Sequence, residues 1–358
     1  MRNAVPPSGH PGRDDLVPGL RRERPKRRGR RVLAVLLAVV LVLLLAAAGA
    51  VVYLTSSIGN DISRIPDAFR GLDAGSRPAS FGGTTFLLVG TDSRAAGPTT
   101  GAGADAAVDA GSQRSDVIML GTVAPDGRSA SVVSIPRDAW VDVPGRGMNK
   151  INAAYAYGGA PLLIGTVEQL TGIRVDHFGV IDFAGFTSLV DSVGGIDVTV
   201  AQTTGNDGVD FTAGENHLDG TQALAYVRQR YDLPGGDLDR AARQQNAMKA
   251  LLDKVQQKVT TDPGAIYAFA TSVGDAVSVD DSLSNAGLVQ LAVGSRDLRA
   301  STVSFVTAPV TGLGREGGQS VVHLDAEQGA QLWGAVRNGS VAQYADLHPA
   351  DALGSTPS

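Results

Sequence analysis

The chain has 358 residues, of which 31 are Lys or Arg and 36 are Asp or Glu, giving a formal net charge of −5. It contains no cysteine, which excludes disulfides, thiol nucleophiles and cysteine-ligated metals, and its five histidines are not spaced as paired zinc ligands. A chain of this length can bury a sufficient core without such cross-links.

The N-terminal part of the sequence predicts a membrane anchor. Residues 32–54 carry no charge, and a helix of that length, rising about 1.5 Å per residue, crosses a hydrocarbon core of about 30 Å. The basic segment at 1–31 stays on the cytoplasmic side. A cleaved secretory signal is the alternative, but the apolar run continues beyond the small residues at 48–50. We expect a single-pass protein of the cell membrane, with its N-terminus cytoplasmic and the rest outside.

Charge divides the chain into a basic tail and an acidic remainder. Residues 1–31 hold ten Lys or Arg against three Asp or Glu, a net charge of +7. Because the whole chain has a net charge of −5, the remaining residues carry a net charge of −12. This balance excludes a generally cationic surface for the exported part, and no DNA-binding pattern is present there. We therefore expect no nucleic-acid partner, and a local cluster of arginines becomes informative.

After a polar stalk at 55–83, the sequence predicts an extracytoplasmic domain at 84–344. Three short apolar runs predict buried strands, at 84–90, 117–123 and 130–135. A Pro-Asp-Gly turn at 125–127 predicts that the second and third strands form a hairpin. The small, polar stretch at 95–113 predicts a mobile loop.

Strands and helices then alternate along the chain. Further elements are expected as helices at 162–170, 183–193, 238–259, 263–277, 282–293 and 325–336 and as strands at 178–181, 196–200 and 301–306. The helix at 238–259 can be capped by Asp237 or Asp239. This pattern predicts an α/β fold, a layered α-β-α domain with a central mixed sheet preceded by one transmembrane helix. We expect residues 345–358 to form a flexible tail.

Charged residues stand at the ends of the predicted strands. Asp92 follows the first strand, Asp116 precedes the second and Arg137 follows the third. Ligands of open α/β sheets bind where strands end, so these side chains can converge if the second strand is antiparallel to its neighbours. Alternatively, the aspartates only stabilise turns or cap helices.

A second group of arginines lies further along the chain. Arg228 and Arg230 are two residues apart, which places both on one face if the segment is extended. Arg240, Arg243 and Gln244 are spaced to share one side of the predicted helix near its N-terminus, where anions are favoured. Guanidinium forks bind phosphate well, although a solvated helix face explains the same spacing.

Several phrases of the sequence follow one another in an order typical of one family. They are LLVGTDSR at 87–94, RSDVIML at 114–120, SIPRD at 134–138, NKINAAYAYGG at 149–159, DSVGGIDV at 191–198, ALAYVRQR at 223–230 and DLDRAARQQ at 237–245. In these phrases the chain resembles the LytR-CpsA-Psr family of cell-envelope proteins. The resemblance covers about 84–255. It departs from the family in its 95–113 loop, which is longer than usual.

This resemblance implies a Mg²⁺-dependent transferase that moves a glycopolymer from a polyprenyl-pyrophosphate carrier to peptidoglycan. It implies that Asp92 and Asp116 lie at the metal and that the pyrophosphate is bound by Arg94, Arg137, Lys150, Arg228, Arg230, Arg240, Arg243 and Gln244. The residues it implies as catalytic are Asp92, Arg94, Arg137, Arg228 and Arg230. Asp92 is the candidate base, and Asp237 matches an acidic position without an assigned role.

A polyprenyl tail needs an apolar channel. The apolar helices at 162–170, 183–193 and 248–259 are candidates to line one against the sheet, and ordinary core packing explains the same residues. Two other functions stay open: a polyprenyl-pyrophosphate hydrolase, and a non-catalytic module that binds polyprenyl phosphate. The sequence does not identify the polymer, and peptidoglycan is the acceptor that the resemblance implies.

Overall fold

A computed structural model of the protein describes residues 62–91, 115–261, 271–294 and 298–357. The predicted membrane segment at 32–54 and the predicted loop at 95–113 lie outside these ranges. None of the helices within them is both long and apolar enough to cross a bilayer.

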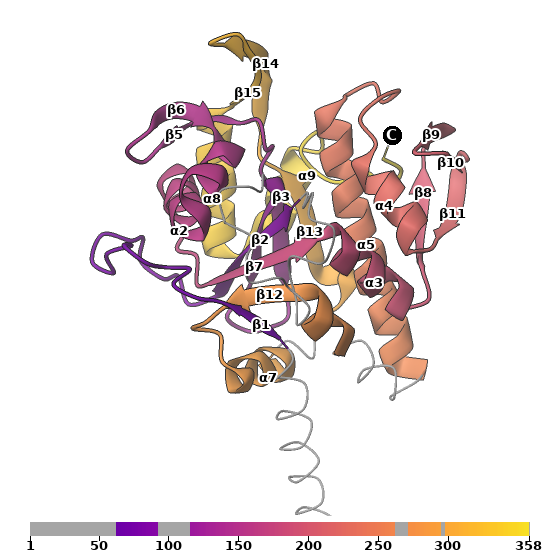
Figure 1. Ribbon diagram of the computed structural model, residues 1–358, viewed down its shortest axis with the longest axis horizontal. Helices are drawn as coiled ribbons and strands as arrows, with labels where there is room; N and C mark the ends of the chain where they lie inside the picture. The colour runs from indigo at the N-terminus through magenta and orange to yellow at the C-terminus, as the bar shows by residue number, and fades with distance from the viewer. Residues whose placement is uncertain (1–61, 92–114, 262–270, 295–297, 358) are drawn as a thin grey trace, which may run out of the picture. The chain divides into compact units, whose positions relative to one another are not determined.

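A seven-stranded mixed sheet forms the centre of the domain (Figure 1). In spatial order its strands are β1 (Ser63–Ile65), β12 (Val277–Asp280), β7 (His177–Asp182), β2 (Thr84–Thr91), β3 (Ser115–Val123), β4 (Ala130–Ser134) and β13 (Val303–Thr307). β2 runs parallel to β7, whereas β3 is antiparallel to both β2 and β4. The predicted mixed sheet and the β3–β4 hairpin are therefore confirmed.

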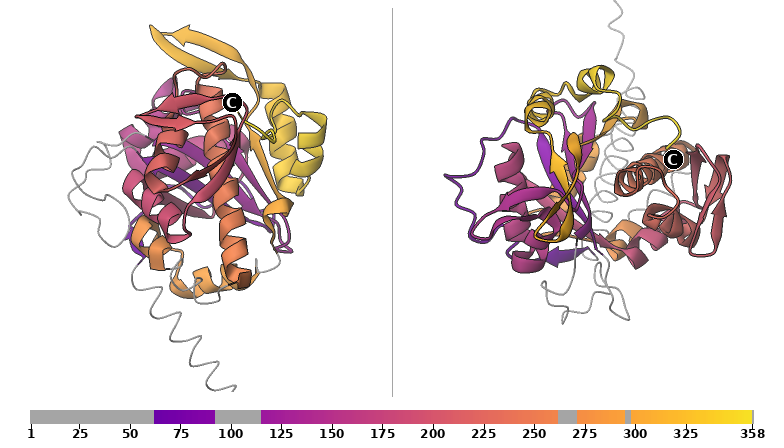
Figure 2. Two further views of the ribbon diagram at one scale, coloured as in Figure 1. Left: turned by 90° about the vertical axis from the view of Figure 1, so that its right-hand side faces the viewer. Right: turned by 90° about the horizontal axis from the view of Figure 1, so that it is seen from above.

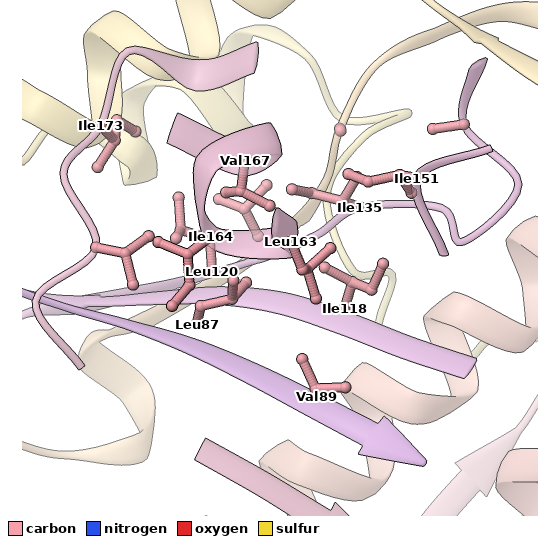
Figure 3. Packing of buried hydrophobic residues seen from close by; sticks show 14 of the residues in the cluster. Leu87, Val89, Ile118, Leu120, Ile135, Ile151, Leu163, Ile164, Val167 and Ile173 are labelled. Carbon is pink, nitrogen blue, oxygen red and sulfur yellow. The ribbon is translucent and has the colours of Figure 1, made fainter. Parts of the chain in front are cut away.

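Successive side chains of β2 point to opposite faces of the sheet and pack against different helices. Along β2, Leu87 and Val89 are buried on the face that meets α2 (Ile151–Thr171), where they pack with Leu120 of β3 and Leu163 of α2 (Figure 3). The intervening Leu88 points to the opposite face. Both faces of β2 are apolar because helices cover both, which explains its continuous apolar run.

Helices form a layer on each face of the sheet (Figure 2). The layer with α2 also contains α8 (Ala326–Asn338) and α9 (Val341–Leu347). The opposite layer contains α3 (Phe183–Ser192), α4 (Gly220–Arg228) and α5 (Asp237–Thr261). α7 (Asn285–Gly294), the short 3-10 helix η2 (Ala300–Thr302) and a helical segment at 271–276 are further helices of the described residues. The predicted α-β-α layering is confirmed for the described residues.

Four two-stranded ribbons extend the domain around this centre. They pair β5 (Trp140–Val143) with β6 (Gly147–Lys150), β8 (Ile196–Val200) with β11 (Gly214–Leu218), β9 (Thr204–Asn206) with β10 (Val209–Phe211), and β14 (Val310–Glu316) with β15 (Gln319–Leu324). The β8–β11 ribbon packs against α5, and the β14–β15 hairpin projects at the upper end of Figure 1.

Three predicted segments differ from the structure. The stalk at 55–83 contains β1, which pairs in parallel with β12 at the sheet edge. The helix predicted at 263–277 lies partly outside the described residues; 271–276 are helical as predicted, and only the last residue differs, because it begins β12. Within the predicted flexible tail, Ala352 forms a β-bridge with Val306, and Leu353 N donates to Phe305 O at 3.0 Å. Long-range pairing of short segments explains all three differences.

A buried carboxylate joins β12 to β7. The Asp280 side chain is fully buried, accepts a hydrogen bond from Phe178 N at 3.0 Å, and lies 3.2 Å from His177 Nδ1. Burial by itself raises the pKa of Asp280, but hydrogen bonds from His177, Ser282 and the Phe178 backbone outweigh it and hold that pKa below its ordinary value.

We expect Asp280 to make folding stability depend on pH in the acid range. A lowered folded-state pKa stabilises the fold above the unfolded-state pKa of about 4, and this stabilisation is lost as the pH falls through the folded-state pKa. Asp280→Asn should lower the melting temperature near pH 7 and flatten its decline below about pH 4. An unchanged acid decline in the variant would contradict this assignment.

Candidate functional site

Strand ends bring polar residues together at one edge of the sheet. Thr91 at the end of β2 pairs with Ser115 at the start of β3 and with Asp182 at the end of β7. Ser134 at the end of β4 pairs with Met119 of β3. Because β3 is antiparallel to both β2 and β4, its start meets their ends.

Asp116 and Arg137 form an ion pair at this edge. Arg137 Nη1 donates to Asp116 Oδ1, and both side chains are largely buried. Arg137 Nε lies 4.0 Å from Asp138 Oδ2, and Lys150 Nζ lies 3.1 Å from Asp138 Oδ1. Lys150 is the last residue of β6 and the N-cap of α2. The structure thus brings Lys150 to the same edge through Asp138, to which the sequence analysis gave no role.

The start of α5 and the loop before it add two arginines. Arg240, which is 6% exposed, donates through Nη2 to Asp237 Oδ2 at 2.9 Å, and Arg230 Nε lies 3.8 Å from Asp237 Oδ1. Burial lowers the pKa of Arg240; Asp237 opposes this, and the like charges of Arg137 and Arg230 lower the pKa further. These electrostatic effects place the three guanidinium groups near one another. We call Arg137, Arg230 and Arg240, with Asp116 and Asp237, the arginine cluster.

Carboxylates balance the charge of Arg137. Burial by itself lowers the pKa of this guanidinium, but Asp116, Asp237 and Asp138 together outweigh burial and raise that pKa. Asp237 thus acts on both Arg137 and Arg240. Arg137 and Arg240 are therefore held by carboxylates, whereas Arg230 is more exposed.

Buried polar atoms without hydrogen-bond partners collect at the same edge. Of the six such side-chain atoms in the described ranges, five belong to this group, namely Thr91 Oγ1, Ser115 Oγ, Ser134 Oγ, Arg137 Nε and Asp237 Oδ1, while Thr85 Oγ1 lies near the other end of β2. Asp237 Oδ1 lies 2.8 Å from Arg240 Nη2, but not in hydrogen-bond geometry. Buried polar groups are normally satisfied, so such a concentration is typical of a ligand site. Four of the five atoms can donate a hydrogen bond, which favours an oxygen-rich anion.

Arg228 and Arg230 do not share one face of a strand, so that expectation is wrong. Arg228 is the last residue of α4, and Arg230 lies in the loop after it. The Arg228 guanidinium stacks 4.9 Å from the centre of the Phe183 ring, and its Nη1 lies 3.9 Å from Asp207 Oδ2. Both arginines are nearly half exposed. They can therefore reach a bound anion from separate elements.

The structure does not bring Arg243 to the arginine cluster. Its side chain is fully buried, donating from Nη1 to Gln229 Oε1 at 2.6 Å and from Nη2 to Thr204 Oγ1 at 2.9 Å. The guanidinium also stacks 4.6 Å from the ring centre of Tyr226 and 5.7 Å from that of Phe211. Arg243 thus ties α5 to the loop after α4 and to β9.

We expect Arg243→Ala to act on stability rather than on ligand binding. Loss of two charge-assisted hydrogen bonds and of ring packing should lower the free energy of unfolding by about 3–5 kcal/mol. Urea unfolding measures this loss, and ligand affinity is then measured on the folded fraction. A variant of normal stability that no longer binds donor lipid would instead place Arg243 in the site.

An apolar cavity of about 220 Å³ lies between the sheet and the layer of α3, α4 and α5. Its wall is almost entirely apolar and includes Leu88, Val117, Met119, Gly179, Phe183, Phe186, Leu224, Val227, Met248 and Leu251. Gln244, whose Nε2 lies 3.5 Å from Val227 O, also lines it. Asp182, at the polar edge of the sheet, lines it as well. The cavity therefore extends to the edge that carries the arginine cluster.

Two of the three candidate helices contribute residues to this cavity, and its use as a channel stays a prediction. Residues of α3 and α5 line the cavity. The segment at 162–170 belongs to α2 and packs in the core on the other side of the sheet, for example through Leu163 and Val167. Apolar periodicity is the same for a core helix and a channel helix, so the sequence could not separate them.

The metal prediction lies partly beyond the described residues. Asp92 and Arg94 fall outside them, so the structure places neither beside Asp116. Within the described ranges, no three His, Asp or Glu side chains gather as a metal-binding group. The Mg²⁺ site stays a prediction.

Comparison with known proteins identifies relatives along most of the chain. It is 37% identical over 295 residues to "Cell wall biosynthesis protein LcpA" of Corynebacterium glutamicum, covering 72% of this chain and 56% of that one. It is 32% identical to the "Polyisoprenyl-teichoic acid–peptidoglycan teichoic acid transferase TagU" of Halalkalibacterium halodurans, covering 77% and 93%. The solved structure "TagT bound to LI-WTA" superposes with a TM-score of 0.55 at 26% identity, covering 78% and 95%.

The match to LcpA spans little more than half of that relative. The family model matches residues 68–338, which include six of the seven strands of the central sheet and the arginine cluster. The chain therefore belongs to the LytR_cpsA_psr family.

Proposed function

We propose that this protein is a membrane-anchored phosphotransferase that attaches a secondary cell-wall glycopolymer, carried on polyprenyl pyrophosphate, to peptidoglycan. The observation that carries this proposal is the arginine cluster at one end of an almost wholly apolar cavity. Such an arrangement suits a ligand with a dense anionic head and a long hydrocarbon tail. The names of TagU and of the ligand-bound TagT structure support this class of substrate.

The arginine cluster would bind the pyrophosphate. Guanidinium forks bind phosphate oxygens bidentately, and removal of water from a partly buried site strengthens each contact. Arg137 and Arg240 are held by Asp116 and Asp237, so they are already oriented, whereas the more exposed Arg230 is free to close on the ligand. The unpartnered hydroxyl groups at the strand ends can donate further hydrogen bonds.

The residues at this edge fit a bound Mg²⁺. This ion prefers one or two carboxylates together with phosphate oxygens, and Asp116 and the predicted ligand Asp92 supply carboxylates. The unpartnered hydroxyls of Thr91 and Ser115 lie at the adjoining strand ends and add neutral oxygens. When bound, Mg²⁺ would neutralise charge on the pyrophosphate.

Transfer proceeds by attack of an acceptor hydroxyl on the phosphorus that carries the polymer. A new P–O bond to the acceptor forms, the bridging P–O bond breaks, and polyprenyl phosphate leaves with the bonding electrons. The hydroxyl proton passes to a base, for which Asp92 is the candidate. Arg137, Arg230 and Arg240 stabilise charge on the transferred and leaving phosphates, which is the main protein contribution in phosphoryl transfer.

The predicted anchor at 32–54 would hold this site at the outer face of the membrane. A transmembrane helix at 32–54 would tether the domain to the leaflet in which a lipid-linked precursor presents its head group.

A reconstitution assay tests the function. Full-length protein in lipid nanodiscs is incubated with Mg²⁺, a polyprenyl-pyrophosphate-linked oligosaccharide and peptidoglycan fragments, and both attached sugar and released polyprenyl phosphate are measured. The proposal predicts attached product in proportion to released polyprenyl phosphate. Release without attachment would indicate a hydrolase, and binding without release would indicate a non-catalytic module; either result rejects the transferase.

A further inference from the structure

A second concavity, separate from the apolar cavity, opens beside the arginine cluster. It has a volume of about 550 Å³ and lies between the 229–236 loop and the β14–β15 hairpin. Its lining is Asp138, Arg230, Tyr231, Gly236, Asp237, Leu313, Gly314, Arg315, Ser320, Val321 and Val322. We call it the acceptor groove, for the role argued below. Its volume is in the range of binding sites for small ligands.

The acceptor groove reaches the reaction site from its own direction. It shares Arg230 and Asp237 with the arginine cluster, and it shares no lining residue with the apolar cavity. An attacking oxygen must approach phosphorus roughly in line with the leaving oxygen, hence from the side away from the departing lipid phosphate. The groove contains two residues of the cluster, and the apolar cavity reaches the same strand ends at Asp182, so the two depressions offer separate approaches.

The hairpin wall of the groove is anchored next to the cluster. Val322 N donates to the carbonyl oxygen of Asp138 at 2.9 Å, and Asp138 directly follows Arg137. The hairpin turns at Gly317 and Gly318, both with positive φ, as a tight two-residue hairpin turn requires. Figure 2 shows the hairpin projecting beyond the helical layers. The groove wall is therefore fixed at its base and accessible along its length.

The lining chemistry suits a charged sugar. Tyr231 is 80% exposed and Leu313 is 72% exposed; with Leu347 they are the three most exposed large hydrophobic side chains in the described part of the chain. Tyrosine and leucine present flat or apolar surfaces that can cover the C–H faces of sugar rings, and the tyrosine hydroxyl still reaches water. Exposed apolar groups that gather in one concavity indicate a binding site.

Arg315 gives the groove an additional cation. It is exposed on the same strand as Leu313, and its Nη2 donates to Gly318 O at 3.1 Å within the hairpin. The two acidic residues of the groove already have cationic partners: Asp138 pairs with Lys150, and Asp237 pairs with Arg240. A carboxylate on an acceptor glycan would thus meet Arg315 rather than uncompensated negative charge.

We propose that the acceptor groove binds the glycan that receives the polymer, a carboxylate-bearing oligosaccharide of the peptidoglycan type. Tyr231 and Leu313 contact sugar rings, Arg315 pairs with a carboxylate, and one sugar hydroxyl is thereby directed toward the arginine cluster. This inference rests on the proposed transferase function and deepens it, because it assigns a site to the second substrate.

Equilibrium binding tests the groove independently of turnover. Full-length protein in nanodiscs is titrated calorimetrically with a soluble muramyl-peptide disaccharide. Tyr231→Ala, Leu313→Ala and Arg315→Ala should each weaken binding about tenfold, since one charge-assisted hydrogen bond or one aromatic contact contributes about that factor. Arg315→Glu should weaken it further through repulsion. Affinity for the donor lipid should stay unchanged in all four variants.

Two exposed residues far from the groove supply matched controls. Arg128 lies in the turn between β3 and β4, at the opposite end of these strands, and Leu347 ends α9 with 78% exposure. Arg128→Ala and Leu347→Ala should bind the disaccharide as wild type does. Equal affinities in groove and control variants, or no binding by the wild type, would overturn the groove. Failure of polymer transfer with this binding pattern intact would reject the transferase function alone.

Discussion

Replacing Arg137 by alanine should lower the turnover number for polymer transfer by about 10²–10³-fold, as removal of one preorganised donor to transition-state charge typically does. Its guanidinium lies at the centre of the arginine cluster and also holds the Asp116 carboxylate. Without Arg137, that carboxylate would face the pyrophosphate as an uncompensated negative charge. The measurement is the initial rate of attached product with saturating donor and acceptor, together with the melting temperature of the variant.

Two further variants make this prediction specific. Arg137→Lys keeps a cation but loses the planar fork, so it should recover only part of the lost rate. Arg128→Ala removes an exposed arginine from the far end of the sheet and should have no effect. A stable Arg137→Ala protein that transfers polymer within threefold of the wild-type rate would remove the arginine cluster from the mechanism, since about 10² is expected.

Local sequence signals were sufficient to predict that Asp116 and Arg137 meet at the strand ends that carry the site. The apolar runs and the Pro-Asp-Gly turn predicted the antiparallel pairing of β3 with β4, whereas the antiparallel pairing of β2 with β3 came only from the structure. The pairing of β3 with β4 alone determines that Asp116 and Arg137 meet. The result follows from strand alternation and turn chemistry, which act over a few residues.

The segment around Arg228 was predicted to be extended, but the sequence before it contains a signal for a helix. Asp219 accepts from Gln222 N at 2.8 Å, and Gln222 Oε1 accepts from Asp219 N at 3.1 Å, which is a capping box. This box begins α4, so residues through Arg228 are helical. The same helix buries Tyr226, which together with Phe211 encloses Arg243. One missed N-cap therefore altered the interpretation of several arginines.

Other features depend on pairing across the chain and have little local signal. β1 has three residues and is stable only because β12, more than 200 residues later, pairs with it. The β14–β15 hairpin did have a local signal, since Gly317-Gly318 between alternating residues is typical of a tight turn. Its position over Asp138, which makes it a wall of the acceptor groove, follows only from tertiary contacts.

Filling the apolar cavity should weaken binding of a donor with a long lipid tail and leave the transfer reaction of a short-tailed donor unchanged. Gly179 of β7 lines the cavity opposite Leu88, and a Cβ there would lie 3.3 Å from Leu88 Cδ2. Gly179→Leu adds four carbon atoms in this space. If they displace four carbons of the polyprenyl tail, at about 0.8 kcal/mol each, donor affinity should fall by about a hundredfold. Titration of nanodisc-bound protein with a long-chain donor measures the loss.

A donor with a tail of one isoprene unit provides the internal comparison, because it does not need the filled space. Its transfer rate should be equal in wild type and Gly179→Leu. Gly121→Leu is the matched substitution, since Gly121 lies in β3 of the same sheet, outside the cavity lining, with its nearest neighbours at 4.0 Å. Long-chain affinity should survive in Gly121→Leu. If Gly179→Leu folds and binds the long-chain donor normally, the tail lies elsewhere, and the cavity is only an imperfectly packed part of the core.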